Sequence, residues 1–315
     1  MRERDEALYN MSQENEVFIF FKFLPYVVRF VCKNYRPKKS VGAPPADLYD
    51  VLMNLAIKQY FGRSLRRSIG LIRMSKLAFK LHFNILCFKS IGNYLNCQCV
   101  KTYADEIIKY TSNPIKYLEK IFATDKTGER TKTFSSWYSI RCNKETKKRD
   151  HINVHLTTGC FLHPVTAIDV LVEKGKDNLI FRKHVKQLGE EGYDIDIWSA
   201  DGVYLARKNC TAVEEVGGIP RFHLKKGLTK KPKGHPAWKR MLAYAKENPE
   251  EYDKGYHTRS NSECTISAKK RKFGDFVRST EDIAKENESH MTWCCYNFSV
   301  LSRAYYELGI DLDFY

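Results

Sequence analysis

The first 115 residues carry apolar side chains at helical spacing. Pro44 and Pro45 precede Asp47, which predicts a helix start, because proline suits the first turn and an acid suits the positive end of the helix dipole. Apolar positions then recur every three or four residues from Leu48 to Tyr60, and a second such segment begins at Ser64. The pattern predicts an all-helical N-terminal domain over residues 1–115.

Beyond residue 117 the hydrophobic pattern changes to a period of two and to short apolar runs, which are typical of strands. The predicted elements are strands at 121–125, 137–141, 152–158 and 165–172, a helix at 178–188, a strand at 195–198, a helix at 205–216 and a strand at 220–224. Antiparallel strands followed by helix–strand–helix–strand is the order of a ribonuclease-H-like α/β fold. We therefore expect a mixed sheet flanked by helices over residues 116–315.

The last part of the predicted second domain contains a lysine-rich segment and two long helices. Residues 225–255 are rich in lysine and interrupted by three prolines, so we interpret them as an insert. Two long helices follow, at 256–272 and 280–308. One stripe of the second helix carries side chains from Ile283 to Leu308, which indicates packing in the core.

The charge of the chain narrows the choice of partners. Lys and Arg total 53 against 37 Asp and Glu, a net charge of +16, which favours nucleic acid over an anionic membrane surface. The most apolar segment, residues 17–32, is interrupted by Lys22, Pro25 and Arg29, so we expect no membrane span. Ten cysteines without a C-x-x-C pair, and with no signal peptide before them, predict reduced thiols rather than a zinc site or a disulfide scaffold.

Three acids stand where the predicted fold would bring them together. Asp125 ends the first strand, Asp201 follows the strand at 195–198, and Glu263 lies on the first C-terminal helix. Three carboxylates at such positions can hold two Mg²⁺ ions, with Mn²⁺ as a substitute, and two metals support attack on a phosphodiester. Asp201 is preferred as the second acid because Gly-Val-Tyr and a helix follow it, but other acids compete for that place: Asp169, Asp194 and Asp196.

The residues around Glu263 strengthen this hypothesis. Relative to Glu263, Tyr256, Arg259 and Lys270 stand at −7, −4 and +7, so a continuous helix would carry all four on one face. Such a face suits a phosphodiester, because Arg and Lys can contact phosphate oxygens while the Glu binds metal. An ordinary ion-paired helix surface is the alternative reading.

At this point the sequence resembles a known family. The spacing Tyr256-x2-Arg259-x3-Glu263-x6-Lys270 matches the signature of the DDE transposases of bacterial and archaeal insertion sequences. The residues around Asp125 and Asp201 resemble the family's two Asp motifs, and Val41–Pro45 is similar to the motif that opens its N-terminal helical domain. The resemblance covers most of the chain from residue 41. Two departures are Lys126, where a small residue is usual after the first Asp, and Ala43, which replaces an arginine.

The resemblance implies a function. Asp125, Asp201 and Glu263 would be the catalytic metal ligands of a cytoplasmic, nucleoid-associated prokaryotic enzyme. It would cleave double-stranded DNA at terminal inverted repeats, with water as the first nucleophile, and join the 3′-hydroxyl to target DNA. The helical domain would bind DNA or mediate dimerisation, with a helix-turn-helix as one option, and a homodimer is the simplest way to bring two ends together.

Basic residues outside the signature provide further candidate DNA contacts. Two runs are dense enough to follow a DNA backbone, and we expect contacts from Lys225, Lys226, Lys230, Lys231, Lys233, Lys269, Arg271 and Lys272. Solvated charge is the alternative for each run. Two other functions also stay open: a non-catalytic DNA-binding protein derived from a transposase, and a metal-dependent nuclease of the same fold that cuts without joining.

Overall fold

The computed structural model describes residues 5–35, 44–131, 151–173, 177–225, 228 and 236–312. The chain divides into two compact units. Unit 1 comprises Met1–Pro114, Gly128–Ile152 and Lys269–Tyr315, and unit 2 comprises Ile115–Thr127 and Asn153–Ala268. The sequence analysis predicts one boundary between residues 115 and 116, whereas each of the two units is built from segments that are separated in sequence, and the C-terminal helix belongs to the unit of the N-terminal helices.

Unit 1 is helical, as the periodicity of the first 115 residues predicts. Its elements are α1 (Glu6–Glu14), α2 (Glu16–Cys32), α3 (Leu48–Phe61), α4 (Leu65–Ala78), α5 (Phe88–Leu95), α6 (Cys99–Ser112) and α13 (Asp282–Leu308). A 3₁₀ turn, Asn113–Leu118, leads from α6 toward unit 2. Among the described residues, no helix is both long and apolar enough to cross a bilayer.

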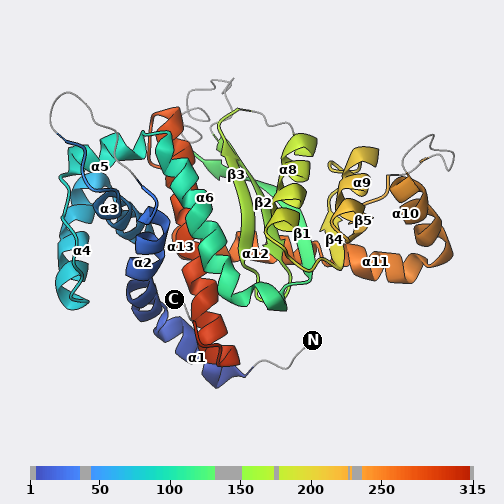
Figure 1. Ribbon diagram of the computed structural model, residues 1–315, viewed down its shortest axis with the longest axis horizontal. Helices are drawn as coiled ribbons and strands as arrows, with labels where there is room; N and C mark the ends of the chain where they lie inside the picture. Colours follow the sequence, from blue (N-terminus) through green and yellow to red (C-terminus); the bar gives the residue numbers. More distant parts are fainter. Residues whose placement is uncertain are drawn as a thin grey trace, which may run out of the picture. The chain divides into compact units, whose positions relative to one another are not determined.

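The centre of unit 1 is α13, which packs against α1, α2, α3, α5 and α6 (Figure 1). Nearly every residue from Asn287 to Ser302 is buried, which confirms the prediction of a core helix, although Ile283 in the first turn is exposed. Burial on all sides of a helix requires neighbours all round it. The N-terminal helices supply them, and this packing explains why the end of the chain belongs to the unit of its beginning.

Unit 2 contains most of a five-stranded mixed sheet of order β3-β2-β1-β4-β5. The strands are β1 (Ile121–Arg130), β2 (His151–Gly159), β3 (Val165–Leu171), β4 (Ile197–Ala200) and β5 (Ile219–Phe222). β2 and β3 are antiparallel, whereas β1 pairs with β4 and β4 with β5 in parallel. The mixed α/β architecture is therefore confirmed, while the strand predicted at 137–141 lies outside the described residues.

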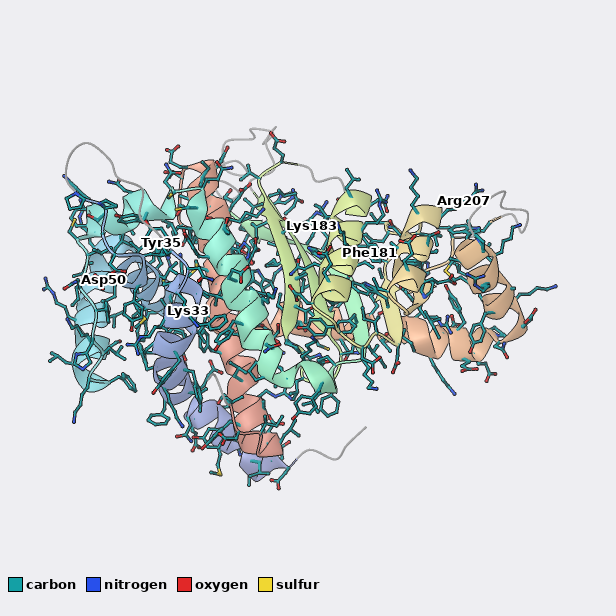
Figure 2. All side chains as sticks on the ribbon, viewed as in Figure 1. Lys33, Tyr35, Asp50, Phe181, Lys183 and Arg207 are labelled. Atoms are coloured by element: carbon teal, nitrogen blue, oxygen red, sulfur yellow. The ribbon has the colours of Figure 1, made fainter. Side chains whose placement is uncertain are left out.

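Helices complete unit 2. They are α8 (Asp177–Glu190), α9 (Arg207–Glu215), α10 (Pro236–Glu247), α11 (Pro249–His257) and the first part of α12 (Ser260–Phe273). Phe181 and Lys183 illustrate the two faces of α8 (Figure 2): Phe181 is fully buried against Trp198 and Phe222, and Lys183 is exposed. The described part of the predicted insert is helical, with Pro236 and Pro249 in the first turns of α10 and α11, where proline is tolerated.

Candidate active site

Strand register brings Asp125 and Asp201 together. β1 and β4 are parallel neighbours, and the last paired residues are Thr124 and Ala200. Each aspartate comes directly after one of these residues, so the two acids lie side by side at the edge of the sheet where β4 ends. The prediction that Asp125 ends its own strand is wrong, because β1 continues past it to Arg130. Each aspartate also accepts a hydrogen bond from the next backbone N–H, at 2.8 Å from Lys126 and 2.6 Å from Gly202. These bonds hold both carboxylates in place.

Arg259 connects Asp125 with Glu263, which stands in the first turn of α12. One guanidinium nitrogen, Nη1, lies 3.1 Å from Asp125 Oδ2, and the other, Nη2, lies 2.7 Å from Glu263 Oε1. The planar guanidinium suits such a bridge because its N–H groups point in fixed directions. The bridge is partly open to solvent, with the side chain of Glu263 about half exposed at 55%. The predicted first and third acids therefore lie at one site.

The pKa of Asp125 responds to the charges of both other acids. Burial raises the pKa of Asp125 above its ordinary value, and the charges of Glu263 and Asp201 raise it further. The backbone N–H of Lys126 and the guanidinium of Arg259 act in the opposite direction. Carboxylates this close repel one another unless a cation intervenes. In the structure, Arg259 supplies that positive charge.

The rival acids do not share this edge. Asp194 and Asp196 are exposed, and Asp194 pairs with Lys120 at 2.8 Å. Asp169 on β3 is nearly buried and is bound by Lys183 and His184, which hold its pKa below the ordinary range although burial acts the other way. Asp201 is thus the acid that lies beside Asp125.

The donor chemistry of the site fits a divalent metal ion. Asp125, Asp201 and Glu263 offer only carboxylate oxygens, the ligands that Mg²⁺ and Mn²⁺ prefer. Within the described residues, however, no three His, Cys, Asp or Glu side chains are already arranged to hold a metal ion. The Arg259 guanidinium contacts Asp125 and Glu263 at once. Metal binding would require Arg259 to release at least one of these carboxylates.

The helix carrying the four-residue signature differs from the prediction. The expected continuous helix from Tyr256 is broken: α11 ends at His257 and α12 begins at Ser260. A turn, rather than helical spacing, places Tyr256 beside Arg259, with the guanidinium carbon 5.9 Å from the ring centroid and the Arg259 N–H bonded to the Tyr256 carbonyl. The Tyr256 ring also lies 5.3 Å from the ring of His223. The first three signature residues therefore lie together in unit 2, but a turn between two helices places them there instead of one continuous helix.

The C-terminal part of α12 belongs to unit 1, and its basic residues have separate surroundings there. Lys270 donates a hydrogen bond to the Gly128 carbonyl at 3.2 Å, and Lys272 pairs with Glu16. Arg271 is exposed.

Lys269 departs from the sequence interpretation. It is 2% exposed and forms a buried ion pair with Glu129, which leaves its ammonium group no access to a DNA phosphate. A lysine whose charge is buried is almost always paired in this way.

Of the lysines predicted before α10, the structure describes only Lys225. Its side chain is exposed and approaches Gly202, where a Cβ atom would lie 3.4 Å from the Lys225 Cε. Gly202 follows Asp201, so Lys225 adds positive charge next to the carboxylates. The other predicted contacts of this run lie outside the described residues: Lys226, Lys230, Lys231 and Lys233.

A polar cluster around Lys126, the residue after Asp125, was not predicted from the sequence. Lys126 pairs with Asp177 at 3.1 Å, and His155 Nε2 lies 3.5 Å from the same carboxylate oxygen. His155 Nδ1 is 3.1 Å from the Tyr204 hydroxyl, and burial lowers the pKa of His155 to about 4, so the ring is neutral at pH 7. The unusual lysine after Asp125 was the available signal. Its partner, Asp177, starts α8 and looks like an ordinary helix-capping acid.

Comparison of the chain with protein-family models, with curated proteins and with solved structures found no match.

Proposed function

We propose that the chain is a metal-dependent enzyme of DNA strand cleavage and strand transfer, a DDE transposase of an insertion sequence. The observation that carries the proposal is the convergence of Asp125, Asp201 and Glu263. Two of these acids directly follow the last paired residues of two parallel strands, and the third is joined to Asp125 through Arg259. The proposal includes a ribonuclease-H-like fold for the sheet and its helices.

Mg²⁺, when bound, would stabilise the attacking and leaving oxygens of an in-line displacement at phosphorus. Asp125, Asp201 and Glu263 would hold it. Burial of Asp125 disfavours its ionised form, and a bound cation would favour that form.

The neighbouring side chains have roles that follow from their chemistry. Arg259, once freed from Asp125, presents two pairs of N–H groups suited to phosphate oxygens. Tyr256 offers a flat ring beside it, and Lys225 contributes charge on the side of Asp201. These three residues would bind the DNA strand and orient the scissile phosphate toward the carboxylates.

The partners of the proposed enzyme are double-stranded DNA, as terminal inverted repeats and as target, and a second copy of the chain. The net charge of +16 supports a polyanionic partner. Two transposon ends must be cut and joined together, and a homodimer would provide one carboxylate site for each.

The test is a cleavage and joining assay on labelled DNA that carries the ends of the element, run in Mg²⁺, in Mn²⁺ and in EDTA. We expect metal-dependent nicking at the ends followed by a joined product. Asp125→Asn, Asp201→Asn and Glu263→Gln should each abolish nicking, because they remove a carboxylate without adding bulk. Asp194→Asn removes an exposed acid of the same unit and is the matched control.

The remaining outcomes of this assay select among the rival functions. Nicking without joining would support a nuclease. Tight DNA binding without nicking under any metal condition would indicate a DNA-binding protein derived from a transposase, and the proposed chemistry would be wrong. Near-normal activity in any one of the three carboxylate variants would remove that residue from the site.

A further inference from the structure

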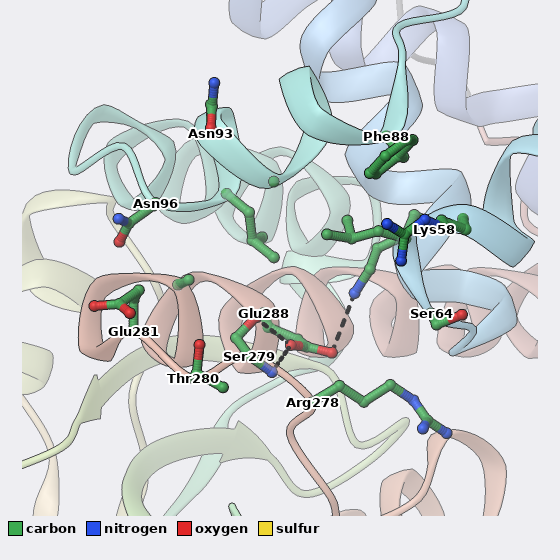
Figure 3. A pocket seen from close by; sticks show the side chains of 15 residues that line it. Lys58, Ser64, Phe88, Asn93, Asn96, Arg278, Ser279, Thr280, Glu281 and Glu288 are labelled. Atoms are coloured by element: carbon green, nitrogen blue, oxygen red, sulfur yellow. Dashed lines mark hydrogen bonds and ion pairs between the residues drawn. The ribbon is translucent and has the colours of Figure 1, made fainter.

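A cavity lies within unit 1, and this unit contains none of the three carboxylates. Its volume is about 550 Å³, within the range of small-molecule sites. α3, α4, α5 and the start of α13 with the segment before it enclose it (Figure 3). The sequence analysis assigned DNA binding or dimerisation to the helical domain as a whole, but it gave no individual role to any residue that lines this cavity.

The floor of the cavity is polar but electrically balanced. Lys58 and Glu288, both buried, form an ion pair at 3.1 Å. The second oxygen of Glu288 accepts hydrogen bonds from the backbone N–H and the hydroxyl of Ser279, at 2.8 and 2.6 Å (Figure 3). Because the carboxylate of Glu288 is fully bonded, the net charge of the cavity is set at its rim.

The rim carries two exposed arginines, Arg66 and Arg278, against one exposed acid, Glu281. Arg278 donates its Nε–H to the Gly62 carbonyl at 3.1 Å, which orients the planar guanidinium. The remaining N–H groups of such a fork match the oxygens of a phosphate. The rim therefore favours an anion.

The aromatic ring of Phe88 supplies the second half of a binding site. The Arg66 guanidinium carbon lies over the Phe88 ring, 4.6 Å from its centroid, which is a cation–π distance. Phe88 is only partly buried, and this pair forms a flat platform at the cavity wall. Nucleobases that have left a duplex stack on aromatic rings and on arginine planes.

The geometry points to a nucleotide-binding site, in which an unpaired base stacks on the Arg66–Phe88 platform and its phosphate contacts Arg278. The nucleotide can belong to a single DNA strand or be a free mononucleotide, because both present the same base and phosphate. The site can be tested separately from the proposed cleavage reaction, since it involves neither the carboxylates nor a metal ion.

The test is photo-crosslinking of the full chain in EDTA, so that neither metal nor cleavage is involved. The probes are 5-iodo-dUMP and a short single strand that contains one 5-iododeoxyuridine. Mass spectrometry then maps the modified peptides. We expect the crosslink within residues 82–96, and we expect Phe88→Leu to abolish it while keeping an apolar side chain at that position. A crosslink with both probes identifies a free nucleotide as sufficient, and a crosslink with the strand alone identifies DNA as the source.

Variants that each remove one arginine charge test the rim of the cavity, and one of them is a matched control. Arg278→Gln and Arg66→Gln should each weaken binding about tenfold, the loss of one charge-assisted contact. Arg67→Gln removes the same charge from an exposed neighbour on α4 that does not line the cavity, and it should change binding less than about twofold. Crosslinks confined to other peptides would overturn the proposal. An equal loss in Arg67→Gln would do the same, as would competition by inorganic phosphate as strong as that by dTMP.

Discussion

Lys269 was predicted to contact DNA, but it forms a buried ion pair with Glu129. Replacing Lys269 tests whether its role is structural. The two side chains are 2% and 1% exposed. Glu129 Oε1 also accepts a hydrogen bond from Trp293 Nε1 at 3.1 Å, and Lys269 lies 5.2 Å from the Trp293 ring centroid. Removing the lysine would leave a carboxylate buried with a single neutral donor.

The expected loss can be worked from this geometry. Breaking a buried ion pair by removing one partner costs about 3–5 kcal/mol, because the remaining charge has neither water nor a counter-ion. We therefore expect Lys269→Met to lower the free energy of unfolding of unit 1 by about 4 kcal/mol, a large part of the stability of an ordinary domain. The double variant Lys269→Met/Glu129→Gln removes both charges and should recover most of that loss.

Denaturant unfolding followed by circular dichroism measures these values, with Arg271→Met as the control. Arg271 is exposed two residues further along α12, so its replacement should change stability by less than about 0.5 kcal/mol. The reasoning would be refuted if Lys269→Met were as stable as the native chain. It would also fail if the double variant were less stable than the single one.

Further predictions concern Asp125 and the glycines. Burial raises the pKa of Asp125 and Arg259 opposes that rise, so the rate of cleavage should fall as the pH drops through this pKa. Arg259→Ala should raise the pKa of Asp125 and shift the fall in rate to higher pH. A pH–rate profile that does not move would contradict this. Gly255→Ala should lower the free energy of unfolding by about 1–3 kcal/mol, because its Cβ would lie 3.0 Å from the buried Arg221 Nε. Gly70→Ala, in open space on α4, should instead raise it by up to about 1 kcal/mol; thermal melts of the two variants compare the opposite signs.

Local patterns were sufficient to predict much of the fold. The apolar runs before Asp125 and Asp201 predicted two strands, and these strands are parallel neighbours, so the first two acids could be located from the sequence although β1 continues past Asp125 to Arg130. The helical spacing in α3 and α13 identified both helices and part of their buried surface, but neighbouring helices bury residues of α3 and α13 beyond the predicted stripe.

Long-range packing could not be predicted in the same way. Nothing local distinguishes one continuous helix over 256–272 from α11 and α12 with a turn between them, since either places Tyr256 near Arg259. Nor does a run of four basic residues show that Lys269 is buried, because its partner Glu129 stands 140 residues earlier. The bridge by Arg259 between two carboxylates also depends on strands and a helix that are distant in sequence.

The central claim is that Asp125, Asp201 and Glu263 form one metal-binding centre, and titration with Mn²⁺ followed by electron paramagnetic resonance tests it most directly. The native chain should bind Mn²⁺, Asp125→Asn and Glu263→Gln should weaken that binding at least about tenfold, and Asp194→Asn should leave it unchanged. Equal binding by all four proteins, or none by the native chain with its DNA present, would contradict the account.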